Sequence, residues 1–137
     1  MAGKTLEELE QLAWGEQTFD SYLVTTCHRL RKKPVDEFTV EDLRIMIGQK
    51  FGLQHLLPRA IEVLEGEPLA GGDFYPGDLL ANVIACDNWL QEHPDLLARV
   101  ANVAEQALEA LGNENEKFRG QLTAFGAFSS GRRMGLY

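Results

Sequence analysis

The sequence predicts an all-α fold, a compact and irregular bundle of about six to seven short helices. The main observation is that apolar residues recur at helical spacing in several segments, most clearly over residues 97–111. No segment alternates clearly between apolar and polar residues, and no internal repeat is present. The 137 residues, 45% of them hydrophobic, can bury one sizeable core, so we expect a single helical domain over residues 1–137.

The first two helices are expected at the N-terminal end. Thr5 and Glu8 have the spacing of a capping box, which predicts a short helix through about Trp14. Residues 21–31 are harder to assign, because Val24 and the two threonines after it favour a strand while the apolar spacing favours a helix. We favour a helix, since its cations then lie in the last turn, where the helix dipole prefers them.

Proline and threonine mark the next boundaries. Pro34 ends the preceding element, and Thr39 has the position of an N-cap for a helix over residues 40–48. A further amphipathic helix is expected over residues 53–65, although it contains Pro58. Because proline removes a helical hydrogen bond and crowds the preceding turn, we expect either a kink or a new helix start there.

The C-terminal half begins with a loop over residues 66–73, which is dense in turn-forming residues. One helix is expected over residues 79–90 and a second over residues 94–111, where a proline opens the helix and Gly112 ends it. A last short helix is expected from Glu114 to about Phe125. The tail over residues 129–137 shows no periodicity, and we expect it to be flexible.

Asp87 conflicts with the expected helix over residues 79–90, because it falls on the apolar stripe of that helix. An unpaired carboxylate in the core would be costly. Either Asp87 pairs with an arginine or the assumed phase of the helix is wrong. The candidate arginines are Arg29, Arg31 and Arg44.

Charge is the most informative bulk property. The formal net charge is −8, and residues 51–116 alone carry 2 basic and 12 acidic side chains, whereas residues 117–137 carry 4 basic and none acidic. Such an acidic segment is repelled by phosphate backbones and attracted to a basic protein surface. We therefore expect no nucleic-acid partner. Acidity that only keeps a small protein soluble is the alternative.

The basic run at residues 28–33 is the one feature that resembles a nucleic-acid patch. It is short, and no aromatic side chains are interleaved with it to stack on bases. A solvated helix end is the better interpretation, with its cations pairing with the acids between residues 36 and 42.

The sequence GDFYPGDLL at residues 72–80 places two carboxylates and two aromatic rings in a glycine-rich turn. A calcium loop would need a denser array of acids, so we expect no metal here. We expect Asp78 to favour the dipole of the helix that it opens, and Phe74 and Tyr75 to pin the loop to the core. A small hydrolase that uses Asp73 and Asp78 near a histidine is a low-ranked alternative.

Catalytic and cofactor motifs are missing elsewhere. The histidines, His28, His55 and His93, match no metal-ligand spacing, and no glycine-rich phosphate loop is present. We therefore expect no enzyme, no metal and no cofactor. Cys27 and Cys86 have no partner spacing either, which favours two reduced, partly buried thiols over a disulfide.

The sequence also predicts the compartment. No stretch approaches the roughly 18 to 20 uncharged apolar residues that cross a bilayer. The start of the chain is acidic, where a signal peptide would be basic and then apolar. We expect a cytoplasmic protein that does not bind a membrane. The oligomeric state is left open.

Residues 28–80 resemble a known family. Four segments are similar to segments of immunity proteins from bacterial contact-dependent growth inhibition systems. They are HRLRKKP, FTVEDLRIMIGQ, GLQHLLPRA and GDFYPGDLL. The resemblance implies a small cytoplasmic protein without catalysis that binds and neutralises the toxic C-terminal domain of a large exported effector. Toxins of such systems are commonly nucleases, and a nuclease must present a basic groove to phosphate.

The resemblance supplies no binding residues, because the shared segments are typical of residues that build the fold. From charge alone, we expect the toxin to contact exposed acids, with two aromatic side chains as anchors if they are exposed. The acids are Glu62, Glu65, Glu67, Asp73, Glu105 and Glu109, and the aromatic residues are Tyr75 and Trp89. For each acid the alternative is a solvated face, and for each aromatic residue it is the core. The alternative function is a non-catalytic helical adaptor or regulatory domain that binds another basic protein.

Overall fold

The computed structural model describes residues 3–11 and 22–134, with side chains as far as Ser129. Over these residues the chain forms eight α-helices, one short 3-10 helix and no strand, which confirms the all-α prediction. The elements are α1 (Leu6–Glu10), α2 (Tyr22–Arg31), η1 (Val35–Glu37), α3 (Val40–Gly48), α4 (Leu53–Gly66), α5 (Asp78–Ile84), α6 (Asp87–Gln91), α7 (Pro94–Leu111) and α8 (Glu116–Met134).

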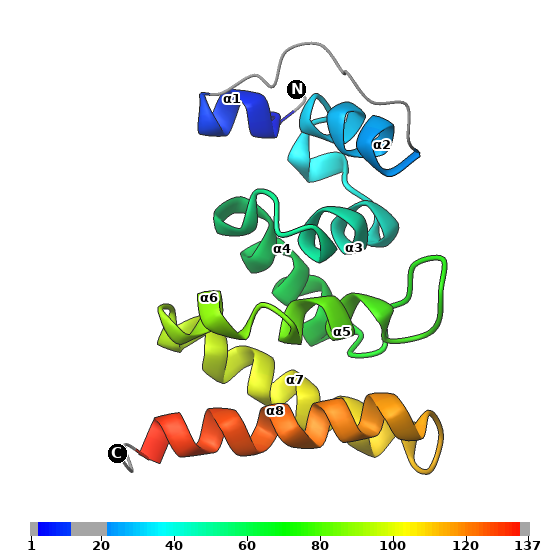
Figure 1. Ribbon diagram of the computed structural model, residues 1–137, viewed down its shortest axis with the longest axis vertical. Helices are drawn as coiled ribbons and strands as arrows, with labels where there is room; N and C mark the ends of the chain where they lie inside the picture. Colours follow the sequence, from blue (N-terminus) through cyan, green and yellow to red (C-terminus); the bar gives the residue numbers. More distant parts are fainter. Residues whose placement is uncertain (1–2, 12–21, 135–137) are drawn as a thin grey trace.

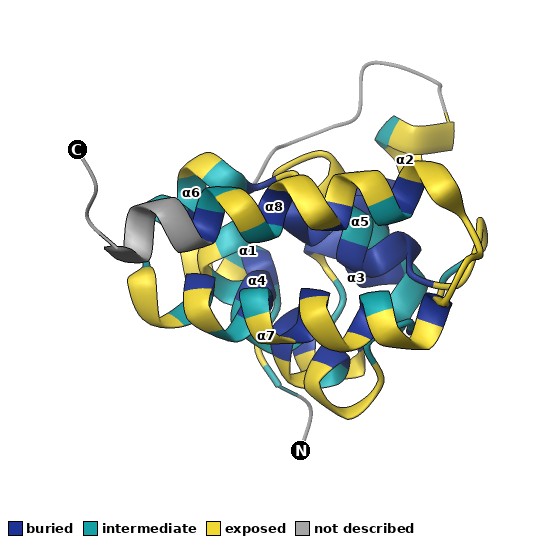
Figure 2. Cartoon of the chain, turned by 90° about the horizontal axis from the view of Figure 1, so that it is seen from below, coloured by how far each residue is buried: buried dark blue, intermediate teal, exposed yellow. Residues whose placement is uncertain are grey.

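The helices are stacked along the long axis of the molecule. Figure 1 shows α1 and α2 at one end, α3 and α4 next, then α5 and α6, and finally α7 and α8 at the other end. Figure 2 shows buried residues toward the middle of the bundle and exposed residues on the outer faces of helices such as α7 and α8. One continuous core of buried residues runs from Leu6 in α1 to Phe125 in α8. This arrangement leaves the loop between α4 and α5 at the side of the stack.

Two capping boxes set the beginnings of α1 and α3, where the sequence predicts a capping box at Thr5 and an N-cap at Thr39. The Thr39 hydroxyl oxygen accepts from the Asp42 amide at 3.1 Å, and the Asp42 carboxylate accepts from the Thr39 amide at 3.0 Å. Thr5 and Glu8 make the same reciprocal pair at α1, with distances of 3.2 and 3.0 Å. Each box satisfies two amides that the first helical turn leaves without partners.

Removing the cap of α3 gives a modest and measurable loss of stability. We expect Thr39→Ala to lower the free energy of unfolding by about 1 kcal/mol, because the Asp42 amide loses its acceptor. Thr39→Ser is the matched control, since serine keeps the hydroxyl and should stay close to wild type. Urea unfolding of the three proteins measures this difference, and equal stability of the alanine and serine variants would contradict it.

The predicted helix over residues 79–90 is wrong, because the chain turns at Ala85 and Cys86 and forms two helices, α5 and α6. The turn changes the phase, so that Leu90 is buried and Asp87 is only half-buried. Asp87 lies in the first turn of α6, where its Oδ1 accepts from the Asn88 amide at 2.8 Å. The second of the two explanations for Asp87 is therefore correct.

Three other boundaries differ from the sequence prediction. The first helix ends at Glu10 because Gln11 adopts a left-handed C-cap conformation, and Trp14 lies outside the described residues. α4 runs through Pro58 as one helix. α8 continues to Met134 instead of ending near Phe125. A flexible tail over residues 129–137 stays a prediction.

Polar and sulfur-containing side chains follow the sequence prediction in part. Cys27 and Cys86 are buried and free, as expected. Lys33 pairs with Asp42 at 2.7 Å, as expected for a solvated helix end. Arg31 differs, because it is buried and pairs with Glu10 of α1. This ion pair joins the first two helices.

Candidate functional site

Residues 71–77, in the loop between α4 and α5, are ordered by one buried carboxylate. Asp78 Oδ1 accepts from the Gly72 amide at 2.6 Å, and Oδ2 accepts from the amides of Phe74 and Tyr75 at 3.0 and 3.4 Å. The Asp78 side chain is only 3% exposed. Its main role is therefore to fold the loop back onto the start of α5.

A second carboxylate fastens the loop to α3. Glu41 Oε1 accepts from the Asp73 amide at 2.9 Å, and the Glu41 carboxylate also accepts from Nε and Nη2 along one edge of the Arg44 guanidinium. Arg44 Nε lies 3.6 Å from Asp78 Oδ2, so the guanidinium stands between the two carboxylates. A Cβ at position 72 would collide with the Glu41 carboxylate, so a larger residue there would displace that side chain from its contacts with the loop.

These contacts make the loop attachment sensitive to acid. The hydrogen bonds from Arg44 hold the pKa of Glu41 below its ordinary value of 4.5. A lowered folded-state pKa adds stability above the unfolded pKa, and this stability is lost as the pH falls through the folded value. We expect the stability advantage of wild type over Glu41→Gln to be constant near neutral pH and to shrink below about pH 4.5. Urea unfolding at several pH values measures it, and an advantage that persists unchanged at about pH 3 would refute this assignment.

The loop displays two aromatic side chains in different ways. Phe74 is 72% exposed, and the Arg44 guanidinium lies 4.1 Å from its ring centroid. Tyr75 is 36% exposed and meets Phe118 of α8 edge to face, with ring centroids 5.9 Å apart. Burial raises the pKa of the Tyr75 hydroxyl. The expectation that both rings pin the loop to the core is wrong for Phe74, because the loop is held by carboxylates instead.

The predicted acids are exposed and lie on α4, on the loop after it and on α7. Glu65 is paired with Arg99 of α7 through two hydrogen bonds of 2.6 and 2.9 Å. The negative charge of Glu62 also helps to raise the pKa of Arg99. Glu105 lines a hollow between α7 and α8, with Glu109 one turn further along α7. Glu67 lies exposed at the C-cap of α4. Asp73 lies exposed in the loop described above.

Trp89 belongs to a different part of the molecule. It is half-buried and stacks on His93, with ring centroids 3.6 Å apart and planes 11° from parallel. Figure 1 shows α6, which carries Trp89, on the side of the stack opposite the loop between α4 and α5. The structure therefore brings Asp73 and Tyr75 together, and it places Trp89 apart from them.

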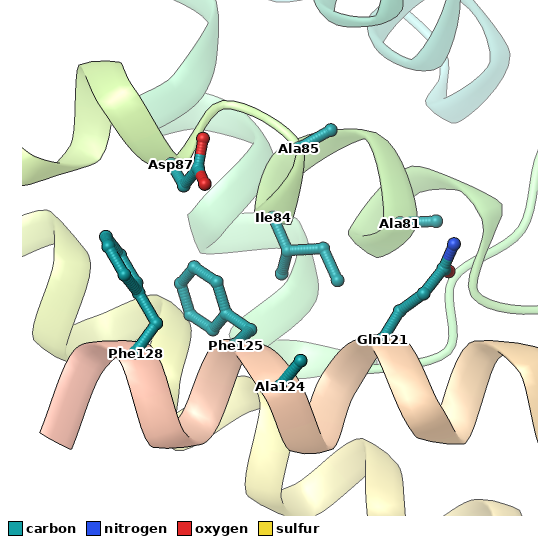
Figure 3. A pocket seen from close by; sticks show the side chains of 8 residues that line it. All are labelled: Ala81, Ile84, Ala85, Asp87, Gln121, Ala124, Phe125 and Phe128. Atoms are coloured by element: carbon teal, nitrogen blue, oxygen red, sulfur yellow. The ribbon is translucent and has the colours of Figure 1, made fainter. Parts of the chain in front are cut away.

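A hollow of about 330 Å³ lies between α8 and the α5–α6 turn. Figure 3 shows Phe125 and Phe128 on its α8 side, with Ile84 and Asp87 across from them. Its lining is mostly apolar, and Asp87 is the carboxylate in the wall. No polar cluster accompanies that carboxylate, so the hollow lacks the paired groups that acid–base chemistry needs.

The described residues hold no group of three or more histidine, cysteine or acidic side chains that could bind a metal ion. None of the described helices is long and apolar enough to cross a bilayer. Both carboxylates of the low-ranked hydrolase alternative have other surroundings. The buried Asp78 carboxylate accepts from loop amides, whereas Asp73 is exposed and is bonded to Glu41 through its backbone amide.

Sequence reasoning missed three residues of this site: Glu41, Arg44 and Phe74. The first two lie in α3, more than 25 residues before the loop, and no local pattern links the segments. A signal for Phe74 was present, because an aromatic residue flanked by Gly71, Gly72 and Pro76 lies in a segment that turns at the surface.

The described residues form an all-helical fold, in which an ordered loop exposes one aromatic ring beside an exposed acid. A sequence model of the family described as CDI immunity proteins matches residues 8–100, which is well over half of the chain. The chain belongs to this family, whose members are toxin-neutralising immunity proteins of contact-dependent growth inhibition. A search of curated proteins and a search of solved structures found no match.

Proposed function

We propose that this protein binds the C-terminal toxin domain of a cognate contact-dependent growth inhibition effector in the cytoplasm and blocks a nuclease activity. The family match over residues 8–100 carries this proposal. The net charge of −8 supports the nuclease assignment, because a nuclease must present basic residues to phosphate. Carboxylates of the inhibitor can then occupy the place of the substrate phosphates.

Acidic residues spread over the surface support fast and selective association. Glu62, Glu67, Glu105 and Glu109 are exposed, and Asp73 lies in the ordered loop. Such a distribution attracts a basic partner from a distance and repels nucleic acid. We therefore propose that these acids guide the encounter. Glu65 contributes less, because Arg99 neutralises it.

The decisive experiment mixes the purified protein with the toxin domain encoded beside it and measures cleavage of RNA and DNA. We expect complete loss of nuclease activity at an equimolar ratio. An unrelated acidic helical protein of similar net charge is the control, because it tests whether charge alone inhibits. Full activity of the toxin domain at molar excess of this protein would refute the proposal.

The salt dependence of the association rate tests whether the acidic surface guides the encounter with the toxin. We expect the association rate to fall by about tenfold or more when the salt concentration rises from low to several hundred millimolar. Stopped-flow mixing measures this rate. A rate that does not change with salt would show that the acidic surface does not guide the encounter.

A further inference from the structure

We propose that Phe74 is the anchor of the toxin interface and that its ring enters an apolar pocket on the toxin with a basic rim. This inference rests on the proposed function and names the part of the surface that the toxin contacts. It begins from an unusual combination: a large apolar ring is 72% exposed, although the loop that carries it is tightly ordered.

The order of the loop lowers the cost of binding. The amide of Phe74 itself donates to Asp78 Oδ2, and the amides of its two neighbours donate to Glu41 and Asp78. The ring is placed by Arg44, whose guanidinium lies 4.1 Å from the ring centroid. A side chain that is already ordered loses little conformational entropy when a partner covers it, so more of its burial contributes to affinity.

The backbone of the loop is held by groups other than this ring. Asp78 and Glu41 hold the backbone, and Tyr75 packs against Phe118 of α8. Phe74 contributes little burial to the fold, yet a phenylalanine side chain gains a large free energy when a partner removes it from water. Aromatic residues are also enriched at protein interfaces.

Charge defines the chemistry of the partner surface. Three carboxylates and one guanidinium lie at the loop, namely Glu41, Asp73 and Asp78 against Arg44. The exposed carboxylate of this group is Asp73, which immediately precedes Phe74. A pocket that accepts the ring therefore needs lysine or arginine at its rim next to Asp73. This is the surface expected beside a phosphate-binding groove.

The test measures the dissociation constant between the full-length variants and the toxin domain by calorimetry. We expect Phe74→Ala to weaken binding by about 10- to 100-fold, as removal of a central aromatic anchor does. Phe74→Leu should weaken it less, because leucine still fills part of the pocket. We expect Asp73→Asn to slow association and to reduce its dependence on salt.

Tyr22 provides the matched control. It is an aromatic residue on α2 and is 77% exposed, so its removal also deletes an exposed ring. We expect Tyr22→Ala to bind within about twofold of wild type. All variants should keep the urea midpoint of wild type, because both rings are largely exposed.

The outcomes separate this inference from the proposed function. If wild type inhibits the toxin but Phe74→Ala binds as tightly, the inference is overturned and the function stands. Equal weakening by Phe74→Ala and Tyr22→Ala also overturns it. If wild type neither binds nor inhibits the toxin domain, both proposals are wrong.

Discussion

Phe118→Ala is expected to lower the free energy of unfolding by about 3–5 kcal/mol, the range for removing a fully buried phenylalanine. The Phe118 side chain is 1% exposed and lies in α8, where it meets the edge of Tyr75. It also lies under Gly77, where a Cβ would come within 2.5 Å of the ring. Alanine would leave a cavity beneath the loop and would remove the aromatic pair.

The loss of the Phe118 ring should affect the loop as well as the core. We expect hydrogen exchange of the amides in residues 72–78 to speed up in Phe118→Ala, because Tyr75 loses its support. Phe118→Leu is the control that keeps most of the volume, and its expected loss is about 1–1.5 kcal/mol. Urea unfolding measures both variants. A loss under about 1 kcal/mol for the alanine variant would contradict the packing described here.

Phe118 lies outside the part of the chain that the family model matches. The family model matches residues 8–100, whereas α8 begins at Glu116. The loop that carries Phe74 lies inside the match, but the ring that supports it lies outside. A C-terminal helix beyond the matched scaffold thus helps to set the geometry of a loop within it.

Local chemistry made most of the helices predictable. Thr5 and Thr39 have capping-box partners three residues on, Pro94 lies at the first turn of α7, and Gly112 follows its last residue. Each of these signals acts within one helical turn, so it can be interpreted from the sequence alone. Within the ambiguous segment at residues 21–31, Tyr22–Arg31 forms a helix, in which the apolar spacing outweighs the β-branched residues.

Features that depend on distant contacts were not predictable. The break between α5 and α6 allows Leu90 and Ile84 to be buried together, although the helical spacing continues through it. The Glu41–Arg44 pair reaches Asp73 and Asp78 across more than 25 residues. Propensity and periodicity describe neighbours in sequence, so they carry no information about such pairings.

The candidate site shows the same division between local and distant information. Charge correctly identified exposed acids, but it could not show that Arg99 neutralises Glu65. It also gave no reason to propose Phe74, because that proposal depends on the exposure of the ring and on the order of its loop. The packing of α3, α5 and α8 around the loop shows which side chains are ordered at the surface and which are only solvated. The sequence alone does not contain this information.

Asp78→Ala is expected to lower the free energy of unfolding by about 3–5 kcal/mol, the cost of removing one partner from a buried ionic network. Three amides would lose their acceptor, and Arg44 would lose one of its two carboxylates. A loss of this size is a large share of the about 5–15 kcal/mol that holds a small domain folded. Urea unfolding measures it, and Asp78→Asn should lose less, about 1–3 kcal/mol, because its amide oxygen can still accept from the loop.

Asp73→Ala is the matched control within the same loop. Its side chain is exposed and its backbone amide makes the hydrogen bond to Glu41, so we expect a change within about 0.5 kcal/mol. Equal losses in Asp78→Ala and Asp73→Ala would show that Asp78 does not organise the loop. In Asp78→Asn, which should remain folded, we expect toxin affinity to fall as well, because Phe74 is no longer held in position. Since Asp78 is buried beneath the loop, this loss would arise from disorder of the loop and not from a lost contact with the toxin.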